Sequence, residues 1–107
     1  MRYLTKHLTL LVALAVASAS TADEHRVGQR NNEFTTESLT VKVGDSVAFV
    51  NEDTFFHNVY SLSDAKTFDL GSFPQGESKS VTFDSAGEVE VECAIHPNMF
   101  MTITVED

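Results

Sequence analysis

The chain has 107 residues, with 7 Lys and Arg against 16 Asp and Glu, and its formal net charge at pH 7 is −9. Such an acidic surface repels nucleic acids and anionic membranes, which excludes both as expected partners. It serves either solubility alone or the attraction of a protein with a basic docking face. The single cysteine, Cys93, cannot form an internal disulfide, so its thiol is left for burial, for another chain or for a metal.

The N-terminal segment predicts an export signal. Two positive charges within residues 1–7 precede an apolar run at 8–17, and small residues follow as far as Ala22. These are the three parts of a secretory signal peptide. The apolar run is about half of the ~20 residues that a membrane span needs, so we expect no membrane span in the mature form. We expect cleavage after Ala22, with cleavage after Ala19 as the alternative.

Removal of the expected signal peptide, residues 1–22, would leave one small domain, residues 23–107. Arg2 and Lys6 would be lost and every acidic residue kept, so the net charge would fall from −9 to −11. A domain of this size has a thin hydrophobic core, and a bound metal would add much to its stability.

Beyond residue 22 the chain consists of short runs of alternating polar and apolar residues, separated by turn residues. The polar segment 23–32 is compatible with a first strand or with a loose arm. Many short strands without intervening helices predict a single all-β domain, an antiparallel Greek-key β-sandwich. The runs expected to form strands are, in chain order, 38–43, 46–50, 55–62, 67–70, 80–83, 88–93 and 101–105.

The alternation near the C terminus also predicts which side chains point into the core. The glutamates at 88, 90 and 92 share one face of their strand, and Val89, Val91 and Cys93 share the other. The glutamates must face water, so Cys93 points inward at the end of a core strand. By the same parity Met101 points inward with Ile103 and Val105, which makes Met101 a core residue.

The candidate functional residues are concentrated in the run Cys93–Met99. It carries a thiolate at Cys93, an imidazole at His96 and a thioether at Met99, each three residues after the one before. A loop leaving a strand can fold all three onto one ion, and a second imidazole, His57, lies on an apolar strand upstream. Two histidines and one cysteine with a weak axial methionine form the ligand set of blue-copper sites. Each of these residues alone is explained more simply as a buried packing residue. The prediction of one copper ion therefore depends on the cysteine, the histidines and the methionine occurring together at this spacing.

Three segments carry a resemblance to a known family. They are Leu39–Val47, the run Asn51–Asp53 leading to His57–Val59, and Ala86-Gly87 followed by Cys93–Met99. Together these segments resemble the cupredoxins, above all the plastocyanin and amicyanin branch, over nearly all of the mature chain. The fold that the resemblance implies is a cupredoxin-like sandwich.

The resemblance implies equatorial copper ligands at His57, Cys93 and His96. Asn58 matches the family residue that braces the two ligand loops. A plastocyanin-like loop would put the axial ligand at Met101 and an amicyanin-like loop would put it at Met99. We take Met99, because the short loop with its proline matches and Met101 has core parity.

The resemblance further implies an electron carrier. Four ligands leave no open position for a substrate on the metal, so we expect no enzyme. We expect a monomer, and the export signal predicts that it works in the periplasm. Its expected partners are redox proteins such as a c-type cytochrome or a periplasmic oxidoreductase. We expect an apolar wall that keeps water off the metal, and a small surface patch around His96. The wall is assigned to Phe55, Phe56, Ile95 and Phe100, and the patch to Pro97, Asn98 and Phe100.

Three alternatives remain open from the sequence. The first is a copper carrier or storage protein, since cleavage after Ala22 would create an N terminus Asp23-Glu24-His25 whose amine and imidazole can chelate Cu(II). The second is a zinc hydrolase with a Cys-His-His site, which lacks a carboxylate placed as a base. The third is an adhesion-type sandwich without a metal.

Overall fold

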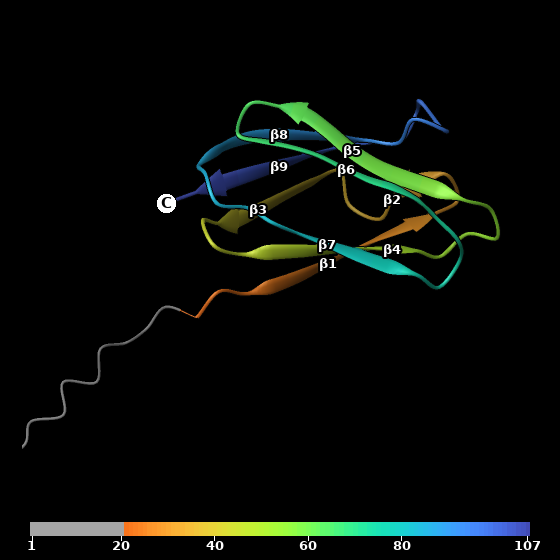
Figure 1. Cartoon of the computed structure of the whole chain (residues 1–107), viewed down its shortest axis with the longest axis horizontal. Coiled ribbons are helices and arrows are strands. Elements are labelled where there is room, and N and C mark those ends of the chain that lie inside the picture. The colour runs from red at the N-terminus through yellow and green to blue at the C-terminus, as the bar shows by residue number, and fades with distance from the viewer. Residues whose placement is uncertain (1–20) are drawn as a thin grey trace, which may run out of the picture.

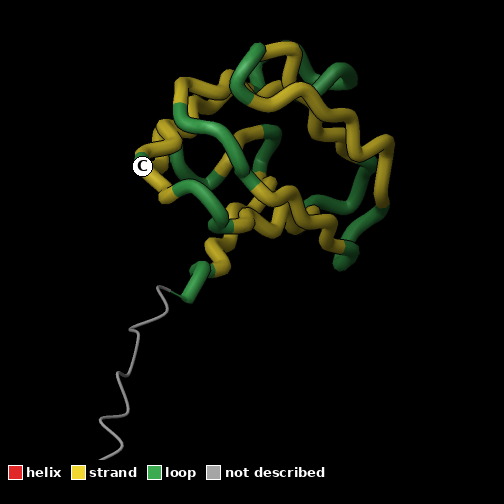
Figure 2. The backbone as a smooth tube through the Cα atoms, turned by 60° about the vertical axis from the view of Figure 1, so that its left-hand side comes forward, coloured by secondary structure: helices red, strands yellow, loops and turns green. Residues whose placement is uncertain are grey.

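Two stacked β-sheets form the part of the chain that the computed structural model describes, residues 21–107, which contains no helix. The first sheet has the strand order β2-β1-β4-β7 and the second has the order β3-β9-β8-β5-β6. Figure 1 shows the two layers, and Figure 2 shows the loops that join their strands. The strands are β1 (Glu24–Arg30), β2 (Glu33–Phe34), β3 (Ser38–Lys42), β4 (Ser46–Asn51), β5 (His57–Ser63), β6 (Lys66–Phe73), β7 (Ser78–Thr82), β8 (Gly87–Glu92) and β9 (Phe100–Glu106).

This architecture confirms the predicted all-β sandwich. Most neighbouring strands are antiparallel, whereas β1 runs parallel to β4 and β3 runs parallel to β9. The polar segment that the sequence left undecided forms β1, which is held by its register with β4. Residues 1–20 of the expected signal peptide lie outside the described residues. Within 21–107 there is no helix that is long and apolar enough to cross a membrane.

Most predicted strands are off by one or two residues at an end, and two of these differences concern the segments beside the predicted site. The strand expected from residue 55 begins at His57, and Phe55 and Phe56 lie in the preceding loop. The buried side-chain amide of Asn51 donates hydrogen bonds to the carbonyls of Phe55 and Phe73, at 2.8 and 2.9 Å, which holds the loop turned in before the strand starts. The short strand expected at 67–70 extends to eight residues, and Pro74 follows its end.

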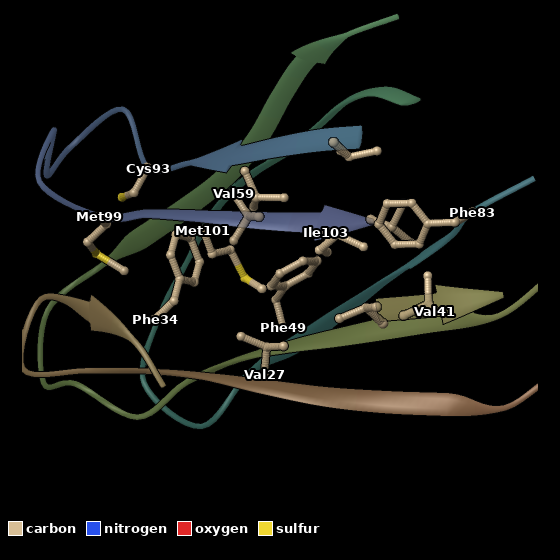
Figure 3. Packing of buried hydrophobic residues seen from close by; sticks show 14 of the residues in the cluster. Val27, Phe34, Val41, Phe49, Val59, Phe83, Cys93, Met99, Met101 and Ile103 are labelled. Carbon is tan, nitrogen blue, oxygen red and sulfur yellow. The ribbon is translucent and has the colours of Figure 1, made fainter. Parts of the chain in front are cut away.

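The core lies between the sheets and follows the predicted alternation. Cys93 is 2% exposed and continues the inward row of β8, while the inward row of β9 begins at the fully buried Met101. Figure 3 shows Cys93 and Met99 at one end of the core and Val41 and Phe83 near the other, with Met101 pointing into the middle. The sandwich therefore places the predicted ligands at one end of its core.

Candidate metal centre

The four predicted ligands come from two segments of the chain. His57 is the first residue of β5, Cys93 directly follows β8, His96 lies in the loop after it, and Met99 immediately precedes β9. Strands β5 and β8 are neighbours in the five-stranded sheet, and β8 pairs with β9. The sheet therefore brings the start of one strand beside the loop that joins two others.

The side chains of His57, Cys93 and His96 converge, since their ligand atoms all lie within 4.8 Å of one another. The Sγ atom of Cys93 is 3.9 Å from Nδ1 of His57 and 3.9 Å from Nδ1 of His96. An ion at about 2.0–2.1 Å from nitrogen and about 2.3 Å from sulfur separates those donors by about 3.6–3.9 Å at bond angles of about 110–130°. The three donors are therefore spaced to share one metal ion.

A carboxylate holds the ring of His57. Nε2 of His57 lies 2.7 Å from Oδ2 of Asp53, and both side chains are buried. With its Nε2–H donated to Asp53, the ring directs the Nδ1 lone pair toward Cys93. A carboxylate bonded to the outer nitrogen in this way fixes the tautomer and the orientation of a metal-binding histidine.

Asp53 is itself held by the backbone of a turn. Its two carboxylate oxygens accept the N–H groups of Asn31 and Asn32, at 2.7 and 3.1 Å, and both asparagines have the left-handed φ that such a turn requires. Burial would raise the pKa of the Asp53 carboxyl, but the hydrogen bonds from His57, Asn32 and Asn31 outweigh burial, and the pKa is lowered. The group that orients His57 is therefore an anion at neutral pH.

A hydrogen bond links the two ligand segments. Oδ1 of Asn58 accepts the backbone N–H of Ala94 at 2.7 Å. Because Asn58 follows His57 and Ala94 follows Cys93, this bond holds the first histidine and the thiolate in one relative position. The brace that the sequence resemblance implied for Asn58 is thus present.

The two methionines have different surroundings. Met99 is 1% exposed, lies in the ligand loop, and donates its backbone N–H to the carbonyl of His96 at 2.9 Å. Met101 stands opposite Val91 in the β8–β9 ladder and points into the sandwich interior. Figure 3 places the thioether of Met99, and not that of Met101, at the end of the core occupied by Cys93.

The residues expected to form an apolar wall around the metal are for the most part exposed at the protein surface. Phe55 packs against both imidazoles, with ring centroids 5.1 Å from His57 and 5.3 Å from His96, but it is 40% exposed. Phe56 and Ile95 in the loops, and Phe100 at the start of β9, turn about half of their surface to the solvent. The predicted wall is therefore confirmed only for Phe55, which covers both imidazoles.

Sequence reasoning identified the donor residues but missed Asp53. The run Asn51–Asp53 entered the prediction only as part of the family resemblance, and the carboxylate of Asp53 was given no role. A carboxylate four residues before a buried histidine was the available signal, but outside a regular helix or strand such spacing does not define a common face. The contact depends on the loop conformation, which the sequence pattern does not give.

Comparison with known sequences places these features in a family. A family model described as copper binding proteins, plastocyanin/azurin family, matches residues 21–106. The methylamine utilization protein MauL of Methylorubrum extorquens is 33% identical over 109 residues, covering 98% of this chain and 96% of its own length. Amicyanin of Paracoccus denitrificans is 31% identical over 81 residues, covering 69% of this chain and 59% of its own length.

Solved structures share the fold. A Cu(I) form of an amicyanin variant superposes with a TM-score of 0.72 at 28% identity, covering 82% of this chain and 88% of its own. The Cu-containing nitrite reductase of Thermus scotoductus gives a TM-score of 0.74 at 29% identity, covering 78% of this chain but 22% of the enzyme. The second match is therefore to one part of a larger protein.

The fold and the clustered donors define a β-sandwich metalloprotein. The chain belongs to the plastocyanin/azurin family of copper-binding proteins. Its cofactor is copper, and the donor chemistry fits this metal, because thiolate and imidazole together suit copper while the three converging side chains include no carboxylate.

Proposed function

We propose that the mature chain is a periplasmic blue-copper electron carrier that passes single electrons between redox proteins. The observation that carries this proposal is the convergence of one thiolate and two imidazole Nδ1 atoms at one end of the sandwich. The similarity to amicyanin, which extends to sequence and fold, supports the same conclusion.

Within this proposal, His57, Cys93 and His96 are the equatorial ligands and Met99 is the axial ligand. Bound copper supplies a one-electron couple between Cu(I) and Cu(II). The chain's contribution would be to hold the two imidazole nitrogens, the thiolate and the weaker thioether of Met99 in an arrangement that both oxidation states can accept. The bonds from Asp53 to His57 and from Asn58 to Ala94 keep the donors in place, so that little moves when an electron arrives or leaves.

We assign no catalytic reaction to this domain. The proposed four donors leave no open position at which a substrate could bind the metal, whereas catalytic metal sites keep one. The copper nitrite reductase that shares the fold has more than three quarters of its chain outside the match. The likeness to that enzyme therefore concerns one domain and not a whole catalytic assembly.

The proposed route for electrons runs through His96. This residue is half-buried, in contrast to the fully buried His57, and its ring packs against the half-exposed Phe55. A small apolar contact of this kind suits a weak, short-lived complex. The acidic remainder of the surface favours a partner with a basic face, such as a c-type cytochrome or a periplasmic oxidoreductase, and we propose a monomeric carrier. The exposed apolar residues are Phe55, Phe56, Ile95 and Phe100.

We also propose that residues 1–22 are a signal peptide and that 23–107 is the mature domain. Strand β1 begins at Glu24, so cleavage after Ala22 leaves the whole strand in the mature chain. Cleavage after Ala19 would leave three more residues ahead of Asp23. The mass of the exported protein distinguishes the two sites.

Copper loading tests the proposed function. Adding Cu(II) to the purified mature chain should produce an intense visible absorption from thiolate-to-copper charge transfer, which a reductant bleaches and an oxidant restores. Electron exchange with a basic c-type cytochrome should slow as ionic strength rises. A protein that stays colourless when loaded would contradict the proposal, and rates that do not change with salt would remove the basic partner from it.

A further inference from the structure

A second group of metal-binding atoms lies at the opposite end of the sandwich. The main-chain nitrogen of Asp23 is 2.9 Å from Oδ1 of Asp45, and Nε2 of His25 is 3.0 Å from Oδ2 of the same carboxylate. Asp45 lies in the β3–β4 turn, which pairs through its backbone with Phe83. Phe83 and the donor Cys93 lie near opposite ends of the core in Figure 3.

The carboxylate of Asp45 is fixed and ionised. Only 5% of the residue is exposed, and Oδ2 also accepts the backbone N–H of Lys42 at 2.9 Å. The hydrogen bond from His25 and those from the backbone N–H groups of Lys42 and Asp23 lower the pKa of Asp45 to about 2. A buried anion therefore faces an imidazole that is partly open to solvent.

The proposed cleavage after Ala22 changes the chemistry of the main-chain nitrogen of Asp23. While Ala22 precedes it, the nitrogen of Asp23 is an amide, which has no lone pair for a metal unless it first loses its proton. Cleavage after Ala22 converts it into an α-amine, which does. A hollow of about 140 Å³ beside Asp45 is lined partly by Thr21 and Ala22, so the same cleavage removes two of its walls.

We propose that the mature N terminus is a second metal site, in which the α-amine of Asp23, the Nε2 atom of His25 and the carboxylate of Asp45 bind one divalent ion. The ion takes the place of the ammonium proton and of the proton shared by His25 and Asp45. Neighbouring donors around an ion at about 2.0–2.2 Å lie about 3 Å apart, as these do from Asp45. The site should prefer Cu(II) over Ni(II) and Zn(II).

This site differs from the chelate that the sequence Asp23-Glu24-His25 alone predicts. That chelate uses the amine, two deprotonated backbone amides and the imidazole, and it wraps consecutive nitrogens around one side of the ion. In the structure Glu24 and His25 are paired in register with Ser46 and Val47 of β4. Successive N–H groups of an extended strand point to opposite sides, so the paired strand opposes the wrapped form. Asp45 takes the place of the backbone amides.

The test uses the mature chain, starting at Asp23 and already carrying copper in its blue site. A second equivalent of Cu(II) is added, and electron paramagnetic resonance and calorimetry count the additional bound copper. We expect one additional Cu(II) per chain, with a spectrum different from that of the blue site. This experiment rests on the proposed cleavage and not on electron transfer. The mass of the exported chain tests the cleavage separately.

Three variants locate the additional copper. His25→Gln, Asp45→Asn and a chain that keeps Ala22 should each lose it at a concentration that saturates the parent, while the blue absorption shows that each variant is folded and loaded. Retention of the additional copper in Asp45→Asn would overturn the proposal in favour of the backbone chelate. Retention in the chain that keeps Ala22 would place the ion elsewhere, and an absence of additional copper in the parent would also overturn the proposal.

Discussion

The two imidazoles of the candidate copper site are held in different ways. His57 starts a core strand, is fully buried, and has its outer nitrogen bonded to the carboxylate of Asp53. His96 lies in the loop between β8 and β9 and is half-buried, and within residues 21–107 no carboxylate is paired with its ring. One ligand is therefore fixed by the fold, and the other lies where the site meets the surface.

This difference indicates a division of labour. Rigid donors favour fast electron exchange because the geometry of the metal need not change, but an electron must still leave through a short path. If both histidines were buried like His57, no ligand would reach the surface where a partner docks. If both were half-buried like His96, the positions of the donors would be less fixed. With one histidine of each kind beside Cys93, the site has both a fixed geometry and a short path for the electron, and the following variants test that interpretation.

Replacing Cys93, the ligand that lies next to both histidines, should have the largest effect. Cys93→Ser removes the thiolate, so we expect the intense visible absorption and reversible redox cycling to be lost completely. Absorption spectroscopy and voltammetry of the copper-loaded variant measure this loss. The buried Met101, changed to Leu, serves as the control and should keep its colour. A Cys93→Ser protein that still exchanged electrons would contradict the proposed site.

Removing the carboxylate behind His57 should weaken metal binding. Asp53→Ala leaves the imidazole without its orienting partner, and losses of such contacts typically cost about 10- to 100-fold in metal affinity. Competition with a chelator of known affinity measures the change. Asp53→Asn keeps a hydrogen-bond acceptor and should recover part of the loss. Asp64→Asn changes an exposed acid away from the site and should have no effect. Equal affinities in all four proteins would show that the anchoring of His57 has no role.

The two methionines provide a matched pair. Met99→Leu should change the reduction potential and the visible spectrum, because the axial ligand tunes the copper, whereas Met101→Leu should change neither. Both substitutions conserve volume, so each should cost less than about 1.5 kcal/mol of the free energy of unfolding. Voltammetry and thermal unfolding measure the two properties. A shifted potential in Met101→Leu alone would assign the axial position to Met101.

Changing the surface beside His96 should have the smallest effect. Phe56→Ser removes an exposed ring near the proposed exit, and a lost contact of about 1 kcal/mol corresponds to about fivefold weaker association. Stopped-flow electron exchange with a basic c-type cytochrome measures this. Leu62 is the matched control, since it is 76% exposed on β5 and five residues beyond His57. Equal slowing in Leu62→Ser would move the docking surface away from His96.

The regular parts of the molecule were predictable from local pattern. A strict period of two between 88 and 92 was enough to place Cys93 inward, and the same period placed Met101 in the core. The pairing of β1 with β4 was not predictable, because it is parallel and its partners lie about 20 residues apart, with no turn to define their register. The alternation of a strand indicates its buried face but not its neighbour.

The surroundings of the site were less predictable than its ligands. Donor identity and spacing are chemical properties of the sequence, and they selected Cys93, His96 and His57. The contact between Asp53 and His57, however, is made by an irregular loop whose shape comes from Asn51 and from the turn at Asn31. The exposure of Phe55 and Phe56 has the same origin, since an apolar residue in such a loop can cover the core or face a partner.

A crystal structure of the copper-loaded mature chain, with copper located by its anomalous scattering, tests the central claim most directly. We predict one ion bonded to Sγ of Cys93 and to Nδ1 of both His57 and His96, with a longer contact to Sδ of Met99. Asp53 should remain bonded to Nε2 of His57. Copper bound to Nε2 of His57 with Asp53 displaced, or copper bound away from Cys93, would contradict the account.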